Sequence, residues 1–556
     1  MRKFYTAFFD AILYNRSCGN YKFLIKLNRR ILEIFMKANH LRTKKMLIYG
    51  ELEKYRILAE SLLVGLLVGL VIVMHRLILS NVFSLFKKFY NMGRENFIYI
   101  PLIFAVLIFL GYIIGKSVKL DPMITGSGIP QVEGILLRKL KQKWYSVLVL
   151  KFVSGLVCLG TGLSLGREGP SVQIGACVGE GFAETTKKMD NEKKYFITCG
   201  ASAGLAAAFN APMAGVMFSL EEAHKNFSPI VLLSAISASL AADFASKNFF
   251  GLKPSLNFQQ LSAMPLKYYW ALLILGVVVG ISGTIFNKGL LISQILYKKT
   301  NLSIEMKCII PFIITGIVGL TLPSLLGGGH DLIMSLQNLN ISTKLLVFYI
   351  IIKFIFTFIC FGSGAPGGIF FPLLTLGSLV GDLVGIIMVT YFNIPSHYLL
   401  NFIVIAMAGH FAAIVKSPIT AIILISEMTG SLNHLLSLAV VSLVALLVSD
   451  LLNTKPIYEA LLDRILQSNH LSLEGSYNKK TLVEVSVELG SVMDNNYIKD
   501  IAWPEGCLVV SILRGEKEII PCGSTLLLAG DLVTVMTNEK TAPNVLDDIS
   551  KKASCY

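Results

Sequence analysis

A charged Arg-Glu pair stands between two long apolar stretches of the sequence. The motif Gly166–Pro170 reads Gly-Arg-Glu-Gly-Pro; residues 147–165 before it carry one charge, Lys151, and residues 171–179 after it carry none. A charge at membrane depth costs about 2.5–3.5 kcal/mol on insertion scales, so the pair indicates a functional site. Proline suits the first turn of a helix, whose N-terminus offers unpaired N–H groups and a partial positive charge. The motif therefore predicts an anion site in which Glu168 competes for the anion's place.

Three further breaks marked by glycine, proline or a polar side chain could contribute to this site. Gly126–Pro130 places the Ser127 hydroxyl just before a helix start, Gly364–Pro372 exposes successive N–H groups, and Tyr458 offers a phenolic donor after the last apolar span. A dehydrated halide needs neutral donors to pass, because full positive charges would trap it. Each break alone could be a kink that eases helix packing. Together they predict an anion path.

The composition is typical of a polytopic membrane protein. Of 556 residues, 54% are hydrophobic and 15% are charged, whereas soluble domains carry about 25% charged residues. Apolar stretches long enough to span a membrane recur at 57–80, 99–115, 145–165, 229–244, 268–293, 308–326, 345–361 and 433–451. The nine cysteines show no metal-ligand spacing, and neither a nucleophile elbow nor a phosphate-binding loop is present. We therefore expect no metal, no cofactor and no enzymatic activity.

Positive charge is concentrated at the N-terminus. The net charge of the chain is +15, and residues 1–56 contain 13 Lys and Arg against 4 Asp and Glu. This bias predicts a cytoplasmic N-terminus in a plasma-membrane protein with both termini inside. Apolar residues recur at helical spacing within the segment, which favours an amphipathic helix on anionic lipid over nucleic-acid binding. A partly disordered basic leader is the open alternative. No cleavable signal peptide is expected, because the first 50 residues lack an uninterrupted apolar core.

Proline and glycine spacings predict an internal repeat. The matching positions are Pro170, Gly175 and Gly179 with Pro372, Gly377 and Gly381, and Pro212 and Glu221 with Pro418 and Glu427. The two sets of prolines are offset by 202 and 206 residues. Paired apolar segments broken by Gly and Pro in two halves point to a transporter's midplane site. We predict a membrane domain over residues 57–470, with repeats at about 57–250 and 268–450.

The last 86 residues differ in composition from the rest. Segments 482–488, 507–514 and 531–536 are rich in β-branched residues, and Gly and Pro residues between them mark turns. Residues 471–556 are therefore expected to form a small soluble, cytoplasmic α/β domain.

The sequence resembles the CLC family of chloride channels and chloride/proton antiporters over about residues 57–465. The motifs that carry the resemblance are Gly126–Pro130, Gly166–Pro170, Gly368–Pro372 and Tyr458. The resemblance implies an all-α membrane fold of tilted and broken helices in two inverted repeats, assembled as a homodimer. It also implies that Ser127, Tyr458 and the amides of Ile369 and Phe370 coordinate chloride, and that Glu168 is the external gate. The serine and the Gly-Arg-Glu-Gly-Pro motif are intact, which favours chloride over fluoride.

One further glutamate separates exchangers from channels in this family. Glu222 falls on the position of the internal proton relay, and Glu133 and Lys151 fall on positions that form a charge cluster with it, with Glu221 as a further member of the proton pathway. Leu137 departs from the pattern, because some relatives carry an acid there. The two neighbouring glutamates could instead simply cap a helix end. The expected function is chloride transport in exchange for protons, and a passive voltage- or pH-gated chloride channel is the alternative.

The tail resembles the C-terminal subdomain of RCK/TrkA regulators. The similarity rests on Glu518–Pro521 and Leu526–Asp531. Such modules commonly pair and often bind a small effector, in some cases a cyclic dinucleotide. Because many eukaryotic relatives carry paired CBS modules instead, this tail implies a bacterial origin.

Overall fold

The computed structural model describes residues 21–225, 228–258, 261–337, 342–468, 480–515, 517–538 and 541–554, with side chains from Lys54 onward except that of Asn191. The predicted amphipathic character of residues 1–56 depends almost entirely on side chains outside this set. The chain divides into two compact units. The membrane unit comprises Met1–Leu136 and Gln142–Ile457, and the tail unit comprises Leu137–Lys141 and Tyr458–Tyr556.

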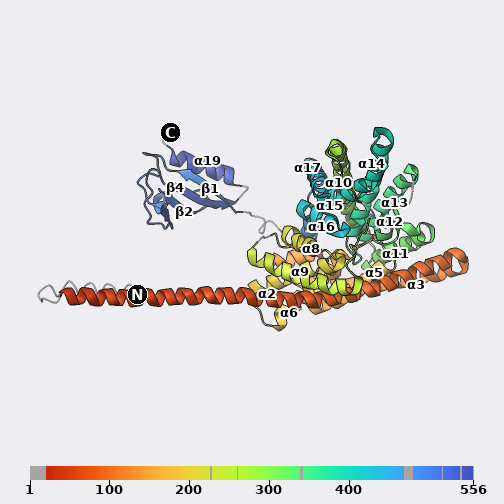
Figure 1. The fold of residues 1–556 in the computed structure, drawn as a ribbon, viewed down its shortest axis with the longest axis horizontal. Coiled ribbons are helices and arrows are strands. Elements are labelled where there is room, and N and C mark those ends of the chain that lie inside the picture. Colours follow the sequence, from red (N-terminus) through yellow and green to blue (C-terminus); the bar gives the residue numbers. More distant parts are fainter. Residues whose placement is uncertain are drawn as a thin grey trace. The chain divides into compact units, whose positions relative to one another are not determined.

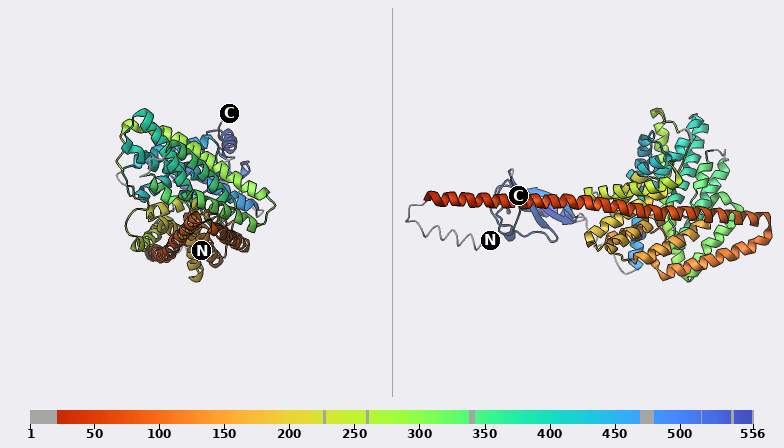
Figure 2. Two further views of the ribbon diagram at one scale, coloured as in Figure 1. Left: turned by 90° about the vertical axis from the view of Figure 1, so that its right-hand side faces the viewer. Right: turned by 60° about the horizontal axis from the view of Figure 1, so that its bottom comes forward.

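The membrane unit repeats one series of helices. Its first half contains α2 (Tyr21–Glu95), α3 (Ile100–Leu120), α4 (Ile129–Leu136), α5 (Trp144–Gly160), α6 (Glu168–Thr185), α7 (Asp190–Phe209), α8 (Pro212–Phe218) with a π-helical turn (Ser219–His224), and α9 (Pro229–Phe250). Its second half contains α10 (Tyr269–Lys299), α11 (Ile304–Thr321), α12 (His330–Ser335), α13 (Thr343–Gly362), α14 (Phe370–Phe392), α15 (Leu399–Val415), α16 (Pro418–Thr429) and α17 (Leu435–Leu451). The helices of the two halves lie side by side in Figures 1 and 2.

Eight helical segments among the described residues are long and apolar enough to cross a membrane. Two of them, Phe370–Phe392 and Ser396–Val415, were not among the predicted spans. The glycines of α14 explain the difference, because they allow close helix packing and do not break the helix. A Cβ atom at Gly377 would lie 3.0 Å from the Met407 Cα, and one at Gly381 would lie 2.5 Å from the Phe402 carbonyl oxygen. The predicted spans at 145–165 and 433–451 are instead the 17-residue helices α5 and α17.

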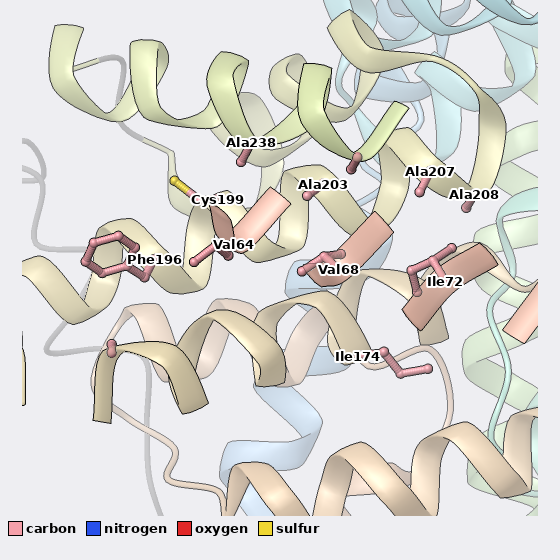
Figure 3. Close-up of a cluster of buried hydrophobic side chains, with 12 residues drawn as sticks. Val64, Val68, Ile72, Ile174, Phe196, Cys199, Ala203, Ala207, Ala208 and Ala238 are labelled. Atoms are coloured by element: carbon pink, nitrogen blue, oxygen red, sulfur yellow. The ribbon is translucent and has the colours of Figure 1, made fainter. Parts of the chain in front are cut away.

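A core of small and branched side chains holds the first half together. Val64, Val68 and Ile72 lie four residues apart on α2, so they share one helix face. Figure 3 shows this face beside α7, α9 and α6, with Ala203 and Ala238 among its neighbours. Alanines permit close approach of helix backbones, which is the usual packing within membranes. The core fixes α6, whose start lies in the site described below, and α7, whose last residue Phe209 packs beside that site.

The tail unit is a small α/β domain, as the sequence predicts. Its four-stranded sheet has the order β1-β4-β2-β3, all antiparallel, with β1 Lys480–Ser486, β2 Leu508–Arg514, β3 Lys517–Ile519 and β4 Leu532–Asn538. Helices α18 (Ile457–Ser468) and α19 (Ala542–Ala553) flank it in the chain. Val485, Ile512, Val533 and Ile549 belong to one buried cluster, so α19 covers the sheet with its own hydrophobic core.

Candidate anion-transport site

Three of the predicted loops meet through backbone hydrogen bonds. Gly166 and Gly368 exchange two N–H···O bonds of 2.7 Å each, as an isolated antiparallel bridge. The Gly126 N–H donates to the Gly364 carbonyl at 3.3 Å, and the Gly367 N–H donates to the Gly126 carbonyl at 2.9 Å. The loops before α4, α6 and α14 therefore form one junction that joins the two halves of the membrane unit.

Glycine is needed at this junction because the backbones approach so closely. A Cβ atom at Gly169 would lie 2.4 Å from the Ser127 Oγ, and one at Gly128 would lie 2.4 Å from the Gln173 Oε1. Gly126 and Gly128 also adopt φ values of 55° and 93°, which side chains disfavour. The glycines of the motifs thus bring Ser127 against the start of α6.

Glu168 lies in the first turn of α6 and is fully buried. Neither of its carboxylate oxygens accepts a hydrogen bond of standard geometry from the described residues. The backbone N–H groups of Arg167, Glu168 and Phe371 face the carboxylate, and the Arg167 Nε lies 3.9 Å from it. A helix N-terminus favours negative charge, so the carboxylate occupies a place suited to a small anion.

The predicted chloride donors from the membrane unit surround the same junction. Ser127 is 2% exposed, and its Oγ has no hydrogen-bond partner among the described residues. Ile369 and Phe370 are fully buried at the start of α14, where backbone N–H groups lack intrahelical partners. The Phe370 ring packs on Phe209 and Phe411, which gives the site an apolar wall. A hydroxyl and helix-start amides are the neutral donors that halide transport requires.

Tyr458, the fourth predicted contributor, begins the tail unit in the first turn of α18. Its side chain is fully buried. Its part in chloride coordination stays a prediction.

Lys151 is fully buried and binds the loop that carries Ser127. Its Nζ donates to the carbonyl oxygens of Ile124 at 2.8 Å and Gly126 at 2.7 Å. The ammonium group therefore fixes the backbone just before the serine. Its predicted participation in a charge cluster with Glu222 stays a prediction.

The two neighbouring glutamates after α8 have different partners. Glu222 is 4% exposed, and its Oε2 accepts a hydrogen bond from the Ser417 Oγ at 2.9 Å. Glu221 instead accepts hydrogen bonds from the Thr420 N–H at 2.8 Å and the Thr420 Oγ1 at 2.7 Å. Glu221 therefore caps a helix, as the alternative interpretation of these two residues predicts. The helix that Glu221 caps is α16, in the second half.

The predicted acid Glu133 lies on α4, which packs against the π-helical turn. Glu133 is 1% exposed, and its Oε1 pairs with the Lys225 Nζ at 2.7 Å. A salt bridge therefore stands at the end of the π-helical turn that carries Glu222.

Lys353 was missed by the sequence reasoning. It is fully buried, and its Nζ donates to the carbonyl oxygens of Leu325 at 2.9 Å and Gly327 at 2.7 Å. Lys151 binds the corresponding loop of the first half in the same way, 202 residues earlier. The repeat offset applied to Lys151 would have found it.

A cavity of about 390 Å³ opens beside Glu168. Its polar lining combines two arginines, the Glu168 carboxylate and a glycine loop: Arg76, Ser80, Gly166, Arg167, Glu168, Ser255, Gly327, Gly328, Gly329, His330 and Asp331. Two guanidinium groups in a concave, partly apolar space attract anions. The cavity therefore brings two arginine side chains into the same space as the carboxylate of Glu168.

Comparisons with known proteins agree with this geometry. The sequence profile described as "Voltage gated chloride channel" matches residues 106–450, and the TrkA-C domain profile matches residues 482–548. The chain is 37% identical over 381 residues to the H(+)/Cl(-) exchange transporter ClcA of Vibrio parahaemolyticus serotype O3:K6, covering 66% of this chain and 80% of that protein. It is 35% identical over 436 residues to ClcA of Vibrio cholerae serotype O1, covering 75% and 91%.

A solved structure is also similar to this chain. The crystal structure of a slow cyanobacterial Cl⁻/H⁺ antiporter superposes with a TM-score of 0.71 at 30% identity, covering 75% of this chain and 99% of that one. These named relatives are transporters, not enzymes. The chain is a multi-pass membrane protein that belongs to the voltage gated chloride channel family, CLC, and carries a C-terminal TrkA-C domain.

Proposed function

We propose that this protein exchanges chloride for protons across the membrane, with Glu168 as the gate and Glu222 as the internal proton relay. The observation that carries the proposal is the fully buried carboxylate of Glu168 at the junction of three anion-donor loops. The relatives named above are chloride/proton exchangers, which supports the coupling to protons. Glu222 is a second buried carboxylate, on a separate helix.

Electrostatics couples the two substrates at the gate. Chloride held by Ser127 and the amides of Ile369 and Phe370 disfavours the ionised form of a neighbouring carboxylate, and so does burial. A protonated Glu168 loses its attraction to the helix N-terminus and leaves the anion position. Chloride and proton therefore strengthen each other's binding, by about 1.4 kcal/mol for each tenfold mutual change in affinity.

The proton route is separate from the anion route on the relay side. Glu222 follows α8 in the π-helical turn, whereas the anion donors precede α4 and begin α14. Glu222 lies ten residues after Pro212, and the last four of these belong to the π-helical turn. We infer that water carries protons along part of the path between Glu222 and Glu168.

The test is a reversal potential measured in liposomes under crossed chloride and proton gradients. The parent should reverse away from the chloride equilibrium potential, and pH-driven chloride uptake should occur. Glu168→Gln should move chloride without protons, because a neutral amide mimics the protonated gate. Glu222→Gln should also lose proton transport but keep chloride binding. Reversal of the parent at the chloride potential would establish a passive channel instead.

The proposal extends to the chain's setting and partners. We place the protein as a homodimer in a bacterial inner membrane, with both termini in the cytoplasm and the basic N-terminal segment against anionic lipid. The TrkA-C domain supports a regulatory role for the tail, with a small effector such as a cyclic dinucleotide. Equilibrium dialysis of the full chain against cyclic dinucleotides, compared with a chain ending at residue 470, tests the effector. Retention by both chains would place binding outside the tail.

A further inference from the structure

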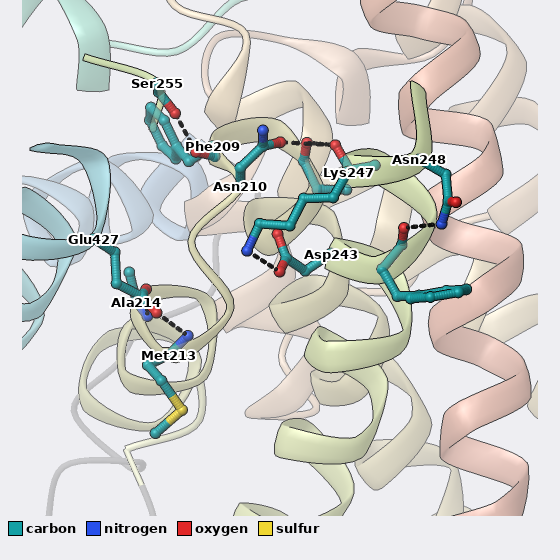
Figure 4. Close-up of polar contacts among 12 residues, drawn as sticks. Phe209, Asn210, Met213, Ala214, Asp243, Lys247, Asn248, Ser255 and Glu427 are labelled. Atoms are coloured by element: carbon teal, nitrogen blue, oxygen red, sulfur yellow. Dashed lines mark hydrogen bonds and ion pairs between the residues drawn. The ribbon is translucent and has the colours of Figure 1, made fainter. Parts of the chain in front are cut away.

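Two short helices from the two halves exchange capping carboxylates. Glu427, near the end of α16, accepts hydrogen bonds from the Met213 N–H at 3.1 Å and the Ala214 N–H at 2.8 Å, in the first turn of α8 (Figure 4). Glu221, just beyond α8, caps the first turn of α16 through Thr420. We call these two contacts the α8 clamp and the α16 clamp.

The clamps are equivalent in chemistry and in position along the repeat. Each glutamate lies nine residues after the proline that begins its own helix, and each binds N–H groups at the start of the other helix. The first N–H groups of a helix have no intrahelical partner, so a carboxylate there satisfies them and complements the helix dipole. The α8 and α16 helices are therefore held to each other at both ends.

Among the described residues, the α16 clamp alone has a second hydrogen bond beside it. Ser417, the residue before the first proline of α16, is 1% exposed and donates its hydroxyl to the Glu222 Oε2 at 2.9 Å. The matching position before α8 is Ala211, and the residue after Glu427 is Met428. The α16 clamp thus stands beside a second buried carboxylate, whereas the matching positions of the α8 clamp are apolar.

We propose that Ser417 is a positioning residue for the proton relay, and that the α16 clamp holds it in place. This inference rests on the proposed role of Glu222. A hydroxyl that donates to a carboxylate stabilises its ionised form and fixes its rotamer. Ser417 follows Lys416, whose left-handed φ of 64° turns the chain into α16. With Glu221 binding Thr420 three residues later, both sides of Ser417 are constrained.

Other charged and titratable groups stand near Glu222. The Lys225–Glu133 pair comes from the end of the π-helical turn and from α4, and the His224 Nδ1 makes a 2.8 Å hydrogen bond with the Thr198 Oγ1 of α7. Ser417 differs from all of them because it comes from the second half of the chain. It therefore links the relay carboxylate to helix α16 across the repeat.

The experiment uses the full chain in liposomes and compares Ser417→Ala with Ser417→Thr. Loss of one hydrogen bond to a carboxylate raises its proton affinity by about tenfold, so the pH midpoint of proton transport in Ser417→Ala should move about one unit upward. The proton-to-chloride ratio should fall, while chloride binding measured by calorimetry should stay at the parental value. Ser417→Thr retains the hydroxyl and should restore both the midpoint and the ratio.

Two controls distinguish the possible failures. Glu427→Gln weakens the α8 clamp as Glu221→Gln weakens the α16 clamp, so both should lower stability in detergent, but only Glu221→Gln should change the ratio. An unchanged midpoint and ratio in Ser417→Ala would overturn the inference, as would an equal effect of Glu427→Gln. If Glu222→Gln exchanges protons at the parental ratio, the proposed relay itself is wrong, whatever Ser417→Ala does.

Discussion

A methyl group at Gly166 should drive the carboxylate of Glu168, the proposed gate, out of its buried position. A Cβ atom there would lie 2.2 Å from the Glu168 Oε2 and 3.1 Å from the Phe371 nitrogen. Real Cβ contacts are essentially never shorter than 3.0 Å, so the carboxylate must move by about 1 Å. Gly166 is not among the residues with positive φ, so alanine adds no backbone strain. The carboxylate, at the end of a flexible side chain, is the group that moves.

The size of the effect follows from the clash. Overpacking a buried site costs about 1–3 kcal/mol. In Gly166→Ala this cost raises the free energy of the conformation in which the Glu168 carboxylate is buried. A bias of about 1–3 kcal/mol corresponds to roughly a 5- to 150-fold change in population. Gly166→Ala should therefore raise chloride affinity by up to that factor, because the competing carboxylate leaves. Proton coupling should fall in parallel.

The assay is isothermal titration of chloride into purified protein, paired with the proton-to-chloride ratio in liposomes. Gly155→Ala is the matched control, because its Cβ would make ordinary contacts of 3.5 Å to His75 and 3.8 Å to Pro170. In a Glu168→Ala background the clash partner is gone, so Gly166→Ala should change nothing further. An equal gain in chloride affinity in that background would refute the reasoning, since the methyl would then act through the loop and not through the Glu168 carboxylate.

Three further changes test other parts of the structure. Lys353→Met leaves the carbonyl groups of Leu325 and Gly327 without their donor, which costs about 1–3 kcal/mol of stability for each group. Removal of a buried ammonium group offsets part of this cost. Amide exchange across residues 325–329 should become faster. In the tail, burial opposes ionisation of Asp531, but hydrogen bonds from Arg514 hold its pKa below the ordinary value. The contact between Arg514 and Asp531 therefore stabilises the tail above about pH 4. This stabilisation is lost as the pH falls through the pKa of Asp531 in the folded state. Arg514→Met should lower tail stability by about 1–3 kcal/mol at neutral pH and flatten its acid dependence, measured by hydrogen exchange of β4. Ile72→Ala should cost about 2–5 kcal/mol in detergent unfolding, whereas Leu70→Ala, at a half-exposed position of the same helix, should cost little.

The junction of the loops was predictable because it depends on backbone approach. Only glycine leaves room where Gly169 meets Ser127, and the backbones of Gly166 and Gly368 are hydrogen-bonded to each other, so residue types and short spacings indicate the junction. The strands of the tail were predictable for a similar local reason, since β-branched runs separated by turn residues favour strands. Both features require little knowledge of distant neighbours.

The parts that could not be predicted depend on contacts between separate helices and loops. The glycines of α14 were interpreted as breaks, yet they face α15, whose position no local pattern reveals. Ser417 precedes a proline like many ordinary residues, and its importance arises only because Glu222 lies 195 positions away in sequence and 2.9 Å away in space. Lys353 could have been predicted from the internal repeat. This would have required applying the 202-residue offset to charged residues as well as to glycine and proline.

The exchanged clamps also set an order in time. The first turn of α8 receives its carboxylate from Glu427, 214 residues after Met213. At a synthesis rate of about 5–20 residues per second, that interval is roughly 10–40 s. Until then the N–H groups of Met213 and Ala214 lack this partner, and unpaired backbone groups in lipid cost several kcal/mol each. The first half of the protein therefore leaves the ribosome unfinished, and a helix of the second half, α16, completes the first turn of α8.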